Sequence, residues 1–428
     1  MKKMINKNGV TSQSQSLSRG EPKPDQISRS VVGRRSFLKG LGATGAMLLP
    51  ASGLLVNQAK AMSDDSGGKL SKGDASILRF LATAEIIESD FWEQYWELGG
   101  AQPTGTIGLP EDDFASTNPA TGKKPNVTGG NAKYTAALKL LDGDMDQYIL
   151  DNTDDEFSHA NFLLAYLKSK GANTADLDGS DGLFGPHFRT LQGSMATGSA
   201  KKLRLTNITK LTINTSFWGR YRSDNKNPDL GDTSFVEAVP TLNSGQHTAI
   251  PRTDADANNA DLIKAIAFTA GFHFPFIEGG GTSLYPSLAQ RVRDPEVLRV
   301  VLSIGPTETA HFQTWVDKAG NANAGNPTPL TVFDPINNNS KVTFADLTAS
   351  TDENLQANLI MPEPCPFLNR KKFPICSIIR PTETEGAAMG ALKALTGNGL
   401  FIGQSEDFFE LLFDLASDAD AARRESDE

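Results

Sequence analysis

The 428-residue chain contains 41 Lys or Arg and 51 Asp or Glu, so its formal net charge is −10 at pH 7. Because residues 1–61 hold ten of the basic residues and only two acidic ones, the remaining residues, about 367, carry about −18. A surface this acidic excludes nucleic acids and anionic membranes from the expected partners. The length allows one helical domain with insertions.

The first 61 residues predict an export signal rather than a folded element. Paired arginines, Arg34 and Arg35, precede an apolar pair and a lysine, and a weakly apolar segment, 41–56, follows them. That segment is too short and too mildly apolar for a spanning helix. Ala59 and Ala61 give the small-x-small pattern of a cleavage site, so the mature chain is expected to begin after Ala61. An uncleaved amphipathic anchor is the alternative.

The paired arginines and the residues that follow them resemble a twin-arginine signal. The resemblance implies the twin-arginine (Tat) export machinery as a partner and a periplasmic or secreted location. It also implies export of an already folded protein, which suits a chain that must acquire metal before crossing. No later apolar run approaches spanning length, so we expect no membrane span in the mature chain.

Apolar periodicity predicts four long helices, at residues 75–98, 131–170, 261–292 and 294–319. The second ends at the C-cap Gly171, and a break at Gly143 is left open. The fourth begins with Asp294 as N-cap and Pro295 in the first helical position. The third is nearly uncharged although it contains Glu278, and a charged side chain there needs a partner or a metal ion.

The remaining segments are expected to connect or extend these helices. Residues 101–130 predict a long loop, because they are rich in Pro, Gly, Thr and Asn. Residues 172–258 predict a β-rich insertion, since 201–218 alternate and are rich in Thr, Leu and Ile. The C-terminal segment, 320–428, predicts a loop-rich extension with short strands at 330–333 and 341–344 and short helices at 386–395 and 408–415.

A Glu-x-x-His motif occurs twice, as Glu156 with His159 and as Glu308 with His311, in a chain that has only five His. Residues three apart share one face of a helix, so both side chains of each pair can reach one metal ion. A single copy is usually an accident of helix composition. Two copies on apolar helices favour a metal site if two neighbouring helices supply further carboxylates.

The spacing of the helices identifies those carboxylates. Residues at equal height on antiparallel neighbours lie equally far from the turn that joins them. Reflecting Glu308 through the turn at 293–294 gives position 278 or 280, and position 278 is Glu. The first helix offers Glu85 and Glu88 in its apolar middle. One helical turn separates these two, so Glu85 is the first choice and Glu88 the reserve.

Three segments carry a resemblance to a known family: LATAEIIESDFW, DDEFSHANFLLAYL and DPEVLRVVLSIGPTETAHF. They resemble helices of the ferritin-like superfamily, and more narrowly the bacterial ferritin-like group related to desiccation-associated proteins. The resemblance covers roughly half of the mature chain. It implies a mainly α fold, a ferritin-like four-helix bundle at 72–319 with the β-rich insertion between its two helix pairs. It also implies six metal ligands: Glu85, Glu156, His159, Glu278, Glu308 and His311.

Carboxylate oxygens and imidazoles together suit two ions of iron, or of manganese, better than copper or zinc. Glu156 and Glu308 are the expected bridges between the two ions. Iron oxidation, peroxide removal and substrate oxidation all fit such a site, so oxidase, peroxidase and iron-handling activities stay open. The alternative is a metal-free structural or stress-protective bundle protein.

The two cysteines and the three remaining histidines are expected to have structural roles rather than to bind metal. Cys365 and Cys376 are the only cysteines, and in an exported protein their short spacing favours a disulfide over free thiols. His187 and His247 lack acidic partners at ligand spacing and are expected at the surface or in loops. His273, in the apolar third helix, is expected to be a buried structural residue rather than a substitute ligand.

Overall fold

The computed structural model describes residues 68–102, 114–220, 234–320, 330–334, 340–347 and 387–424, and these residues are mainly helical. The predicted signal with Arg34, Arg35 and Ala61 lies outside the described residues, as do Cys365 and Cys376. In chain order the elements are α3 (Lys72–Gly99), α4 (Ala132–Leu138), α5 (Met145–Ser169), β1 (Leu191–Gln192), β2 (Leu203–Arg204), α6 (Phe217–Arg220), the 3-10 turn Pro240–Asn243, α7 (Asp254–Asn258), α8 (Ala260–Ala289), α9 (Pro295–Gly320), β3 (Leu330–Asp334), β4 (Ser340–Phe344), α10 (Ala387–Asn398) and α11 (Glu406–Ala421).

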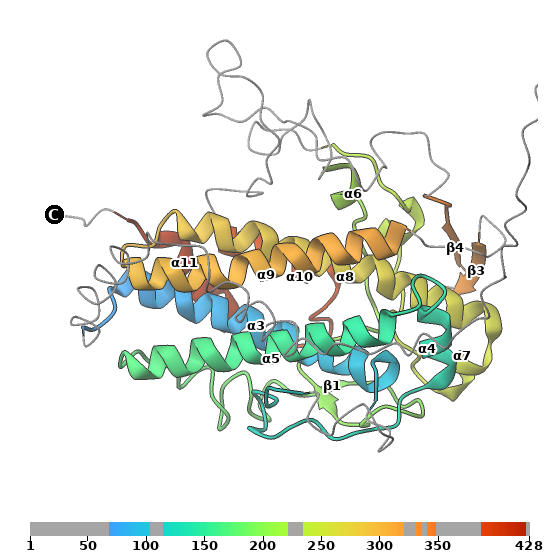
Figure 1. The fold of residues 1–428 in the computed structure, drawn as a ribbon, viewed down its shortest axis with the longest axis horizontal. Helices are drawn as coiled ribbons and strands as arrows, with labels where there is room; N and C mark the ends of the chain where they lie inside the picture. Colours follow the sequence, from blue (N-terminus) through green and yellow to red (C-terminus); the bar gives the residue numbers. More distant parts are fainter. Residues whose placement is uncertain are drawn as a thin grey trace, which may run out of the picture. The chain divides into compact units, whose positions relative to one another are not determined.

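Four long helices position the site, and they pack as the pairs α3 with α5 and α8 with α9 (Figure 1). Ser71 caps α3 by accepting a hydrogen bond from the Asp74 backbone N–H. The Asp74 carboxylate in turn accepts the backbone N–H groups of Arg293 and Asp294 at 2.9 and 3.1 Å. The start of α3 is therefore tied to the turn that joins α8 to α9, which fixes the height of the two helix pairs relative to each other.

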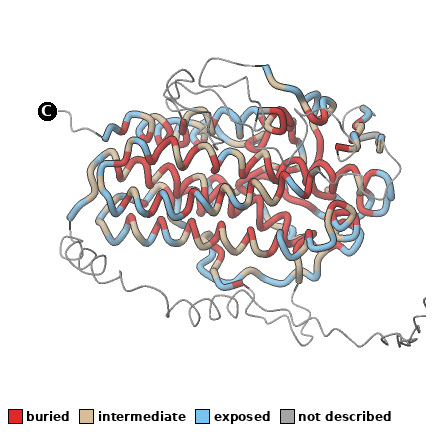
Figure 2. The backbone as a smooth tube through the Cα atoms, turned by 45° about the horizontal axis from the view of Figure 1, so that its top comes forward, coloured by how far each residue is buried: buried red, intermediate tan, exposed pale blue. Residues whose placement is uncertain are grey.

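Buried residues gather in the interior of the described part of the chain (Figure 2). Helix α3 is buried over almost its whole length. Trp92 of α3 stacks on Trp315 of α9, with ring centroids 5.4 Å apart. Both rings also contact Phe274 of α8. Aromatic packing of this kind adds to the free energy gained from burying apolar area. It also holds three of the four helices at fixed spacing just below the candidate site.

The predicted helix 131–170 is two helices, α4 and α5, separated by a turn that includes Gly143. This turn is held to α9, because Asp142 pairs with Lys318 at 2.9 Å. Helix α8 is continuous although it contains Pro275 and Pro286, and α9 is continuous through Pro306. Neighbouring helices therefore stabilise α8 and α9 beyond what their local propensity alone would allow.

The predicted strands in 201–218 are almost absent from the described part of the insertion. Only Leu203–Arg204 pairs with Leu191–Gln192, and Leu211 makes an isolated bridge with His247. Leu205, Ile208, Leu211 and Ile213 are buried, whereas Leu203 is exposed. The backbone groups of this segment bind elsewhere than in a sheet. The N–H groups of Leu205 and Thr206 donate to the Asp90 carboxylate of α3, at 3.1 and 2.9 Å. The segment is thus a buried strap across α3 rather than part of a sheet.

The C-terminal elements agree with their predicted positions where they are described. Strands β3 and β4 form an antiparallel hairpin, with Val332 opposite Val342. Helices α10 and α11 are longer than expected, and α11 packs on α3 and on α10. This extension therefore covers the outer side of the first helix.

The expectation that no further apolar run reaches spanning length is wrong for helix α8. By length and composition alone it could cross a membrane, and among the described helices it is the one that passes this test. Most of it is buried inside the protein, against α9 and α4. A core helix of this length has the same composition, because the positions that pack are apolar on every side.

Two further histidines are now placed. His247 is in a loop, as expected, but it is buried rather than at the surface, and its Nε2 lies 3.0 Å from the carbonyl oxygens of Thr241 and Ser244. His273 is fully buried, with its Nδ1 2.6 Å from the Tyr95 hydroxyl. Burial lowers the pKa of His273 to about 3. Its role as a neutral structural residue is consistent with these contacts.

Candidate metal centre

Six side chains from the four long helices meet in the core, and they are the six that the motif analysis selected. They form two groups in which the donor atoms lie within 4.8 Å of one another. The first group comprises Glu85, Glu156, His159 and Glu308, and the second comprises Glu156, Glu278, Glu308 and His311. Two carboxylates therefore belong to both groups. They are the two residues expected to bridge a pair of ions.

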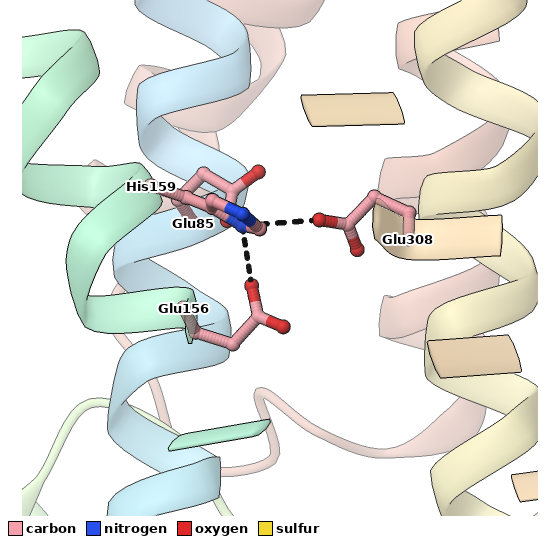
Figure 3. Close-up of side chains that lie close together, drawn as sticks. All are labelled: Glu85, Glu156, His159 and Glu308. Atoms are coloured by element: carbon pink, nitrogen blue, oxygen red, sulfur yellow. Dashed lines mark hydrogen bonds and ion pairs between the residues drawn. The ribbon is translucent and has the colours of Figure 1, made fainter. Parts of the chain in front are cut away.

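In the first group, three carboxylates surround one ring nitrogen (Figure 3). His159 Nδ1 lies 3.3 Å from Glu85 Oε2, 3.2 Å from Glu156 Oε2 and 3.1 Å from Glu308 Oε1. A ring nitrogen carries at most one proton, so it can donate to one of these oxygens but not to all three. Ligands at right angles around an ion, with bonds of about 2.1 Å, lie about 3.0 Å apart. The observed separations match the edges of such a coordination shell.

The second group repeats this arrangement around His311. Its Nδ1 lies 3.1 Å from Glu156 Oε1 and 3.3 Å from Glu278 Oε2. Its other nitrogen, Nε2, lies 3.1 Å from Asp155 Oδ2. A carboxylate on the far nitrogen of a metal-binding histidine fixes the tautomer and the orientation of the ring. Asp155 therefore aims Nδ1 of His311 at the centre.

Buried oxygens with too few partners point towards the two groups. Glu85 Oε2, Glu278 Oε2 and Glu308 Oε1 have only an imidazole nitrogen, which other carboxylates share, at 3.1–3.3 Å. Glu308 Oε2 is buried without a hydrogen-bond partner among the described residues. The outward oxygens differ: Glu85 Oε1 accepts the Tyr285 hydroxyl, and Glu278 Oε1 accepts Trp92 Nε1 at 3.0 Å. Unpaired buried carboxylate oxygens are strongly destabilising. Cations bound between the two groups would satisfy these inward atoms, so the residues present fit a metal centre.

Asn152 links the two groups from one turn below Glu156 on α5. Its amide nitrogen donates to Glu156 Oε1 at 2.7 Å and to Glu278 Oε1 at 3.1 Å. Its amide oxygen accepts Trp315 Nε1 at 2.7 Å. Both ends of the amide are therefore used, which orients two of the carboxylates without adding charge.

The sequence motifs did not indicate five residues that support the centre: Asp155, Asn152, Tyr285, Trp92 and Trp315. Spacing carried a signal for two of them, since Asn152 lies four residues before Glu156 on the same helix face and Asp155 adjoins it. Tyr285 and the two tryptophans reach the centre only through the packing of α3, α8 and α9. No local pattern in the sequence indicates them.

The charges in the centre depend on one another. Burial raises the pKa of Glu308 well above its usual range, and the nearby carboxylates Glu156 and Glu85 raise it further. Burial likewise raises the pKa of Glu85 to about 7, although His159 opposes the shift. Burial also raises the pKa of Glu156, but hydrogen bonds and charges from the two histidines outweigh it and hold that pKa below the usual range.

The pKa values of both histidines shift in the direction opposite to the one that burial alone would cause. Burial lowers the pKa of His159 and His311, but the surrounding carboxylates, Glu85 and Glu278 foremost, raise both values well above normal. The protein side chains by themselves therefore favour the protonated form of both rings and of Glu308. Metal ions would displace these protons on binding.

Glu88, the reserve choice, lies outside both groups. It is buried one helical turn beyond Glu85, and burial with four neighbouring carboxylates raises its pKa well above the usual range. It faces a cavity beside the centre that also reaches Glu85. The structure thus brings Glu85 into the centre and places Glu88 next to it.

No family model, no curated protein and no solved structure matches this chain. The resemblance of the three helical segments to ferritin-like proteins therefore stays an expectation. What the chain does must be inferred from the side chains of the centre and their surroundings.

Proposed function

We propose that this chain is an exported ferritin-like protein in which α3, α5, α8 and α9 form a four-helix bundle around a two-metal carboxylate centre. The observation that carries the proposal is the sharing of Glu156 and Glu308 by two adjacent groups, each completed by one histidine. A Glu from each of two helices and Glu-x-x-His from each of two others is the ligand set of di-iron and di-manganese carboxylate bundles.

Charge and ligand type favour two divalent ions of iron, or of manganese. The four carboxylates of the centre carry four negative charges when ionised, and two divalent cations balance them while both imidazoles stay neutral. Carboxylate oxygens and imidazole nitrogens suit these two metals, whereas thiolate-rich sites suit other transition metals. Glu156 and Glu308 would then be the ligands shared between the two groups.

Such a centre would supply redox chemistry towards oxygen or peroxide, or bind and oxidise iron. The residues of the chain would orient it. Asp155 fixes the ring of His311, Asn152 holds two carboxylates, and Tyr285 donates to Glu85. The buried aromatic rings around α3 and α9 exclude water from one side. Oxidase, peroxidase and iron-handling activities all fit this arrangement.

Metal analysis of the purified mature protein tests the proposal. We expect two equivalents of iron or manganese after reconstitution, and loss of both in the double variant His159→Ala, His311→Ala with the helices still formed. Glu88→Gln is the matched control, because Glu88 is a buried carboxyl on the same helix as Glu85 but outside both groups. Two ions retained by the double variant would show that other residues bind them.

A metal-free structural protein is the second candidate. The distances between the imidazole nitrogens and the carboxylate oxygens support this candidate. Each protonated imidazole lies within 3.3 Å of carboxylate oxygens and can partly neutralise them. Under this alternative the stability of the wild type is unchanged by a chelator or by added iron and manganese. Under the two-metal proposal the unfolding temperature rises with metal.

We also propose that the N-terminal segment directs twin-arginine export. Replacing Arg34 and Arg35 by lysine should leave the protein in the cytoplasm with residues 1–61 attached. Normal export of that double variant would contradict the proposal. The single variant Lys39→Arg, which keeps the pair, is the control.

A further inference from the structure

A cavity of about 290 Å³ lies beside the candidate metal centre, between α3, α8 and α10. Phe312 of α9, Phe217 of α6 and Leu412 of α11 complete its wall. Glu85 contributes to this wall and is also a member of the first ligand group. The cavity therefore reaches the centre directly, without an intervening layer of side chains.

The wall is mostly apolar, and small residues create the space. Rings of Phe80, Phe276 and Phe312 face it from three helices, while Ala84 and Ala391 stand where larger side chains would fill it. Ligand sites in proteins are concave and lined mainly by apolar and aromatic side chains, with a few polar groups that fix the orientation of the ligand. The cavity is thus suited to a hydrocarbon or aromatic group rather than to a cluster of waters.

The polar part of the wall includes two carboxyls, Glu85 and Glu88, which lie one helical turn apart on α3. The other polar side chains of the wall carry hydroxyls: Thr83, Thr282, Ser283, Tyr285 and Ser287. No Lys, Arg or His lines the cavity in the part of the chain that the structure describes. An anionic head group would meet two carboxyls and no cation, so the wall disfavours it.

We propose that this cavity binds a neutral, apolar molecule with a single hydroxyl, an alkanol or a phenol, whose hydroxyl donates to the Glu88 carboxyl. An engineered apolar cavity of 150 Å³ holds benzene, so a space of this size takes a chain of about eight to twelve carbon atoms. The hydrocarbon lies among the phenylalanines and the hydroxyl lies beside Glu85. Binding needs no metal; a role of the molecule as a substrate rests on the proposed two-metal centre.

Calorimetric titration of the mature protein with straight-chain alcohols, from 1-butanol to 1-dodecanol, tests this proposal. Each added methylene should tighten binding about fourfold until the chain fills the cavity, after which affinity stops rising. 1-Octanol should bind at least tenfold more tightly than octanoate at neutral pH. No heat of binding for any alcohol, or tighter binding of octanoate, would overturn the proposal.

Two variants locate the site. Ala391→Phe fills the cavity and should weaken 1-octanol binding at least tenfold, whereas Ala172→Phe, at a half-buried alanine that does not line the cavity, should leave it unchanged. Equal binding by Ala391→Phe and the wild type would overturn the proposal. Should Ala391→Phe fail to fold, the alcohol series and the octanoate comparison on the wild type still decide it. Metal content measured on the same samples separates the two proposals: alcohol binding by a protein that takes up no metal supports this inference alone, and metal uptake without alcohol binding supports only the centre.

Discussion

Glu308 of α9 lies against Gly281 of α8 so closely that a Cβ atom at position 281 would come within 2.7 Å of Oε2 and 3.0 Å of Cγ. The two helices approach there because Gly281 has no side chain. Gly280, the preceding residue, is exposed, and a Cβ atom added to it meets nothing within 4 Å. One glycine of the run therefore sets the position of a shared carboxylate, and its neighbour does not.

Gly281→Ala should displace Glu308 and destabilise the protein by about 1–3 kcal/mol, the usual effect of overpacking. Metal content should fall as well, because Glu308 belongs to both ligand groups. Gly280→Ala is the matched control and should be neutral or stabilising by up to about 1 kcal/mol, since alanine favours the helix. Urea unfolding and metal analysis measure both effects. Equal behaviour of the two variants would contradict this role of Gly281.

Asp155→Asn should weaken metal binding by about 10- to 100-fold while leaving the helices intact. The reason is that the Asp155 carboxylate orients the ring of His311 through Nε2. Asp154→Asn is the control: its carboxylate accepts the backbone N–H groups of Ala115 and Ser116, away from the centre. Competition with a chelator of known affinity measures the change. A larger loss in the Asp154 variant would refute the proposed orientation.

The buried ion pairs of Arg204 should matter for stability. Its guanidinium, only 1% exposed, donates to Glu93 at 3.0 Å and also to Glu97. Arg204→Met removes the cation that pairs with Glu97 and leaves Glu93 with Lys202 alone, at 2.8 Å, so we expect a loss of about 3–5 kcal/mol. Lys210→Met, at an exposed lysine of the same strap, should change little. Denaturant unfolding at pH 7 distinguishes the two variants.

In the metal-free protein, the raised pKa of Glu85 should reduce stability as the pH rises from about 4.5 to 7, whereas the lowered pKa of His273 acts in the opposite sense between about 3 and 6.5. Burial raises the pKa of Glu85 from 4.5 to about 7 in the folded state, so this carboxyl binds more protons in the folded protein than in the unfolded chain in this range. This contribution is fully present below pH 4.5 and is lost as the pH passes 7. The raised pKa values of His159 and His311 extend the loss above pH 6.5.

Unfolding midpoints of the metal-free protein between pH 4.5 and 8 measure this effect. Glu85→Gln should flatten the profile, because the amide does not titrate. Metal-loaded protein should show the opposite slope, since binding releases protons and strengthens as the pH rises. A Glu85→Gln profile identical to that of the wild type would show that Glu85 is already ionised in the folded protein.

A disulfide between Cys365 and Cys376 remains a prediction, because both lie outside the described residues. Closing so short a loop should stabilise the exported protein by about 2–3 kcal/mol. Counting thiols in the unreduced, denatured mature protein checks it. Two reactive thiols would disprove the bond, whereas none, with two after reduction, would establish it.

The ligand positions could be predicted from sequence because each follows from helical geometry. A spacing of three places Glu156 with His159, and reflection through the α8–α9 turn places Glu278 beside Glu308. Their convergence needed only that helices be straight and adjacent. The Pro residues in α8 did not disturb this, because neighbouring helices hold α8 in one piece.

The strap and the supporting residues could not be predicted in the same way. Residues 201–218 alternate as a strand does, but the alternation reflects burial against α3, and the carboxylate of Asp90 takes the backbone N–H groups that a second strand would have bound. Tyr285 and Trp92 meet the centre from helices far apart in sequence. Hydrophobic periodicity and residue spacing describe one helix or strand at a time. They carry no information about contacts between helices that are far apart in the sequence.

The tie between Asp74 and the α8–α9 turn has a consequence for biosynthesis. Glu85 follows Asp74 on the first long helix, whereas Glu278, Glu308 and His311 belong to the last two. A ribosome must therefore synthesise the chain as far as His311, nearly three-quarters of its 428 residues, before all six ligands can meet. A filled centre would mark only those molecules in which all four long helices had been made and had packed together.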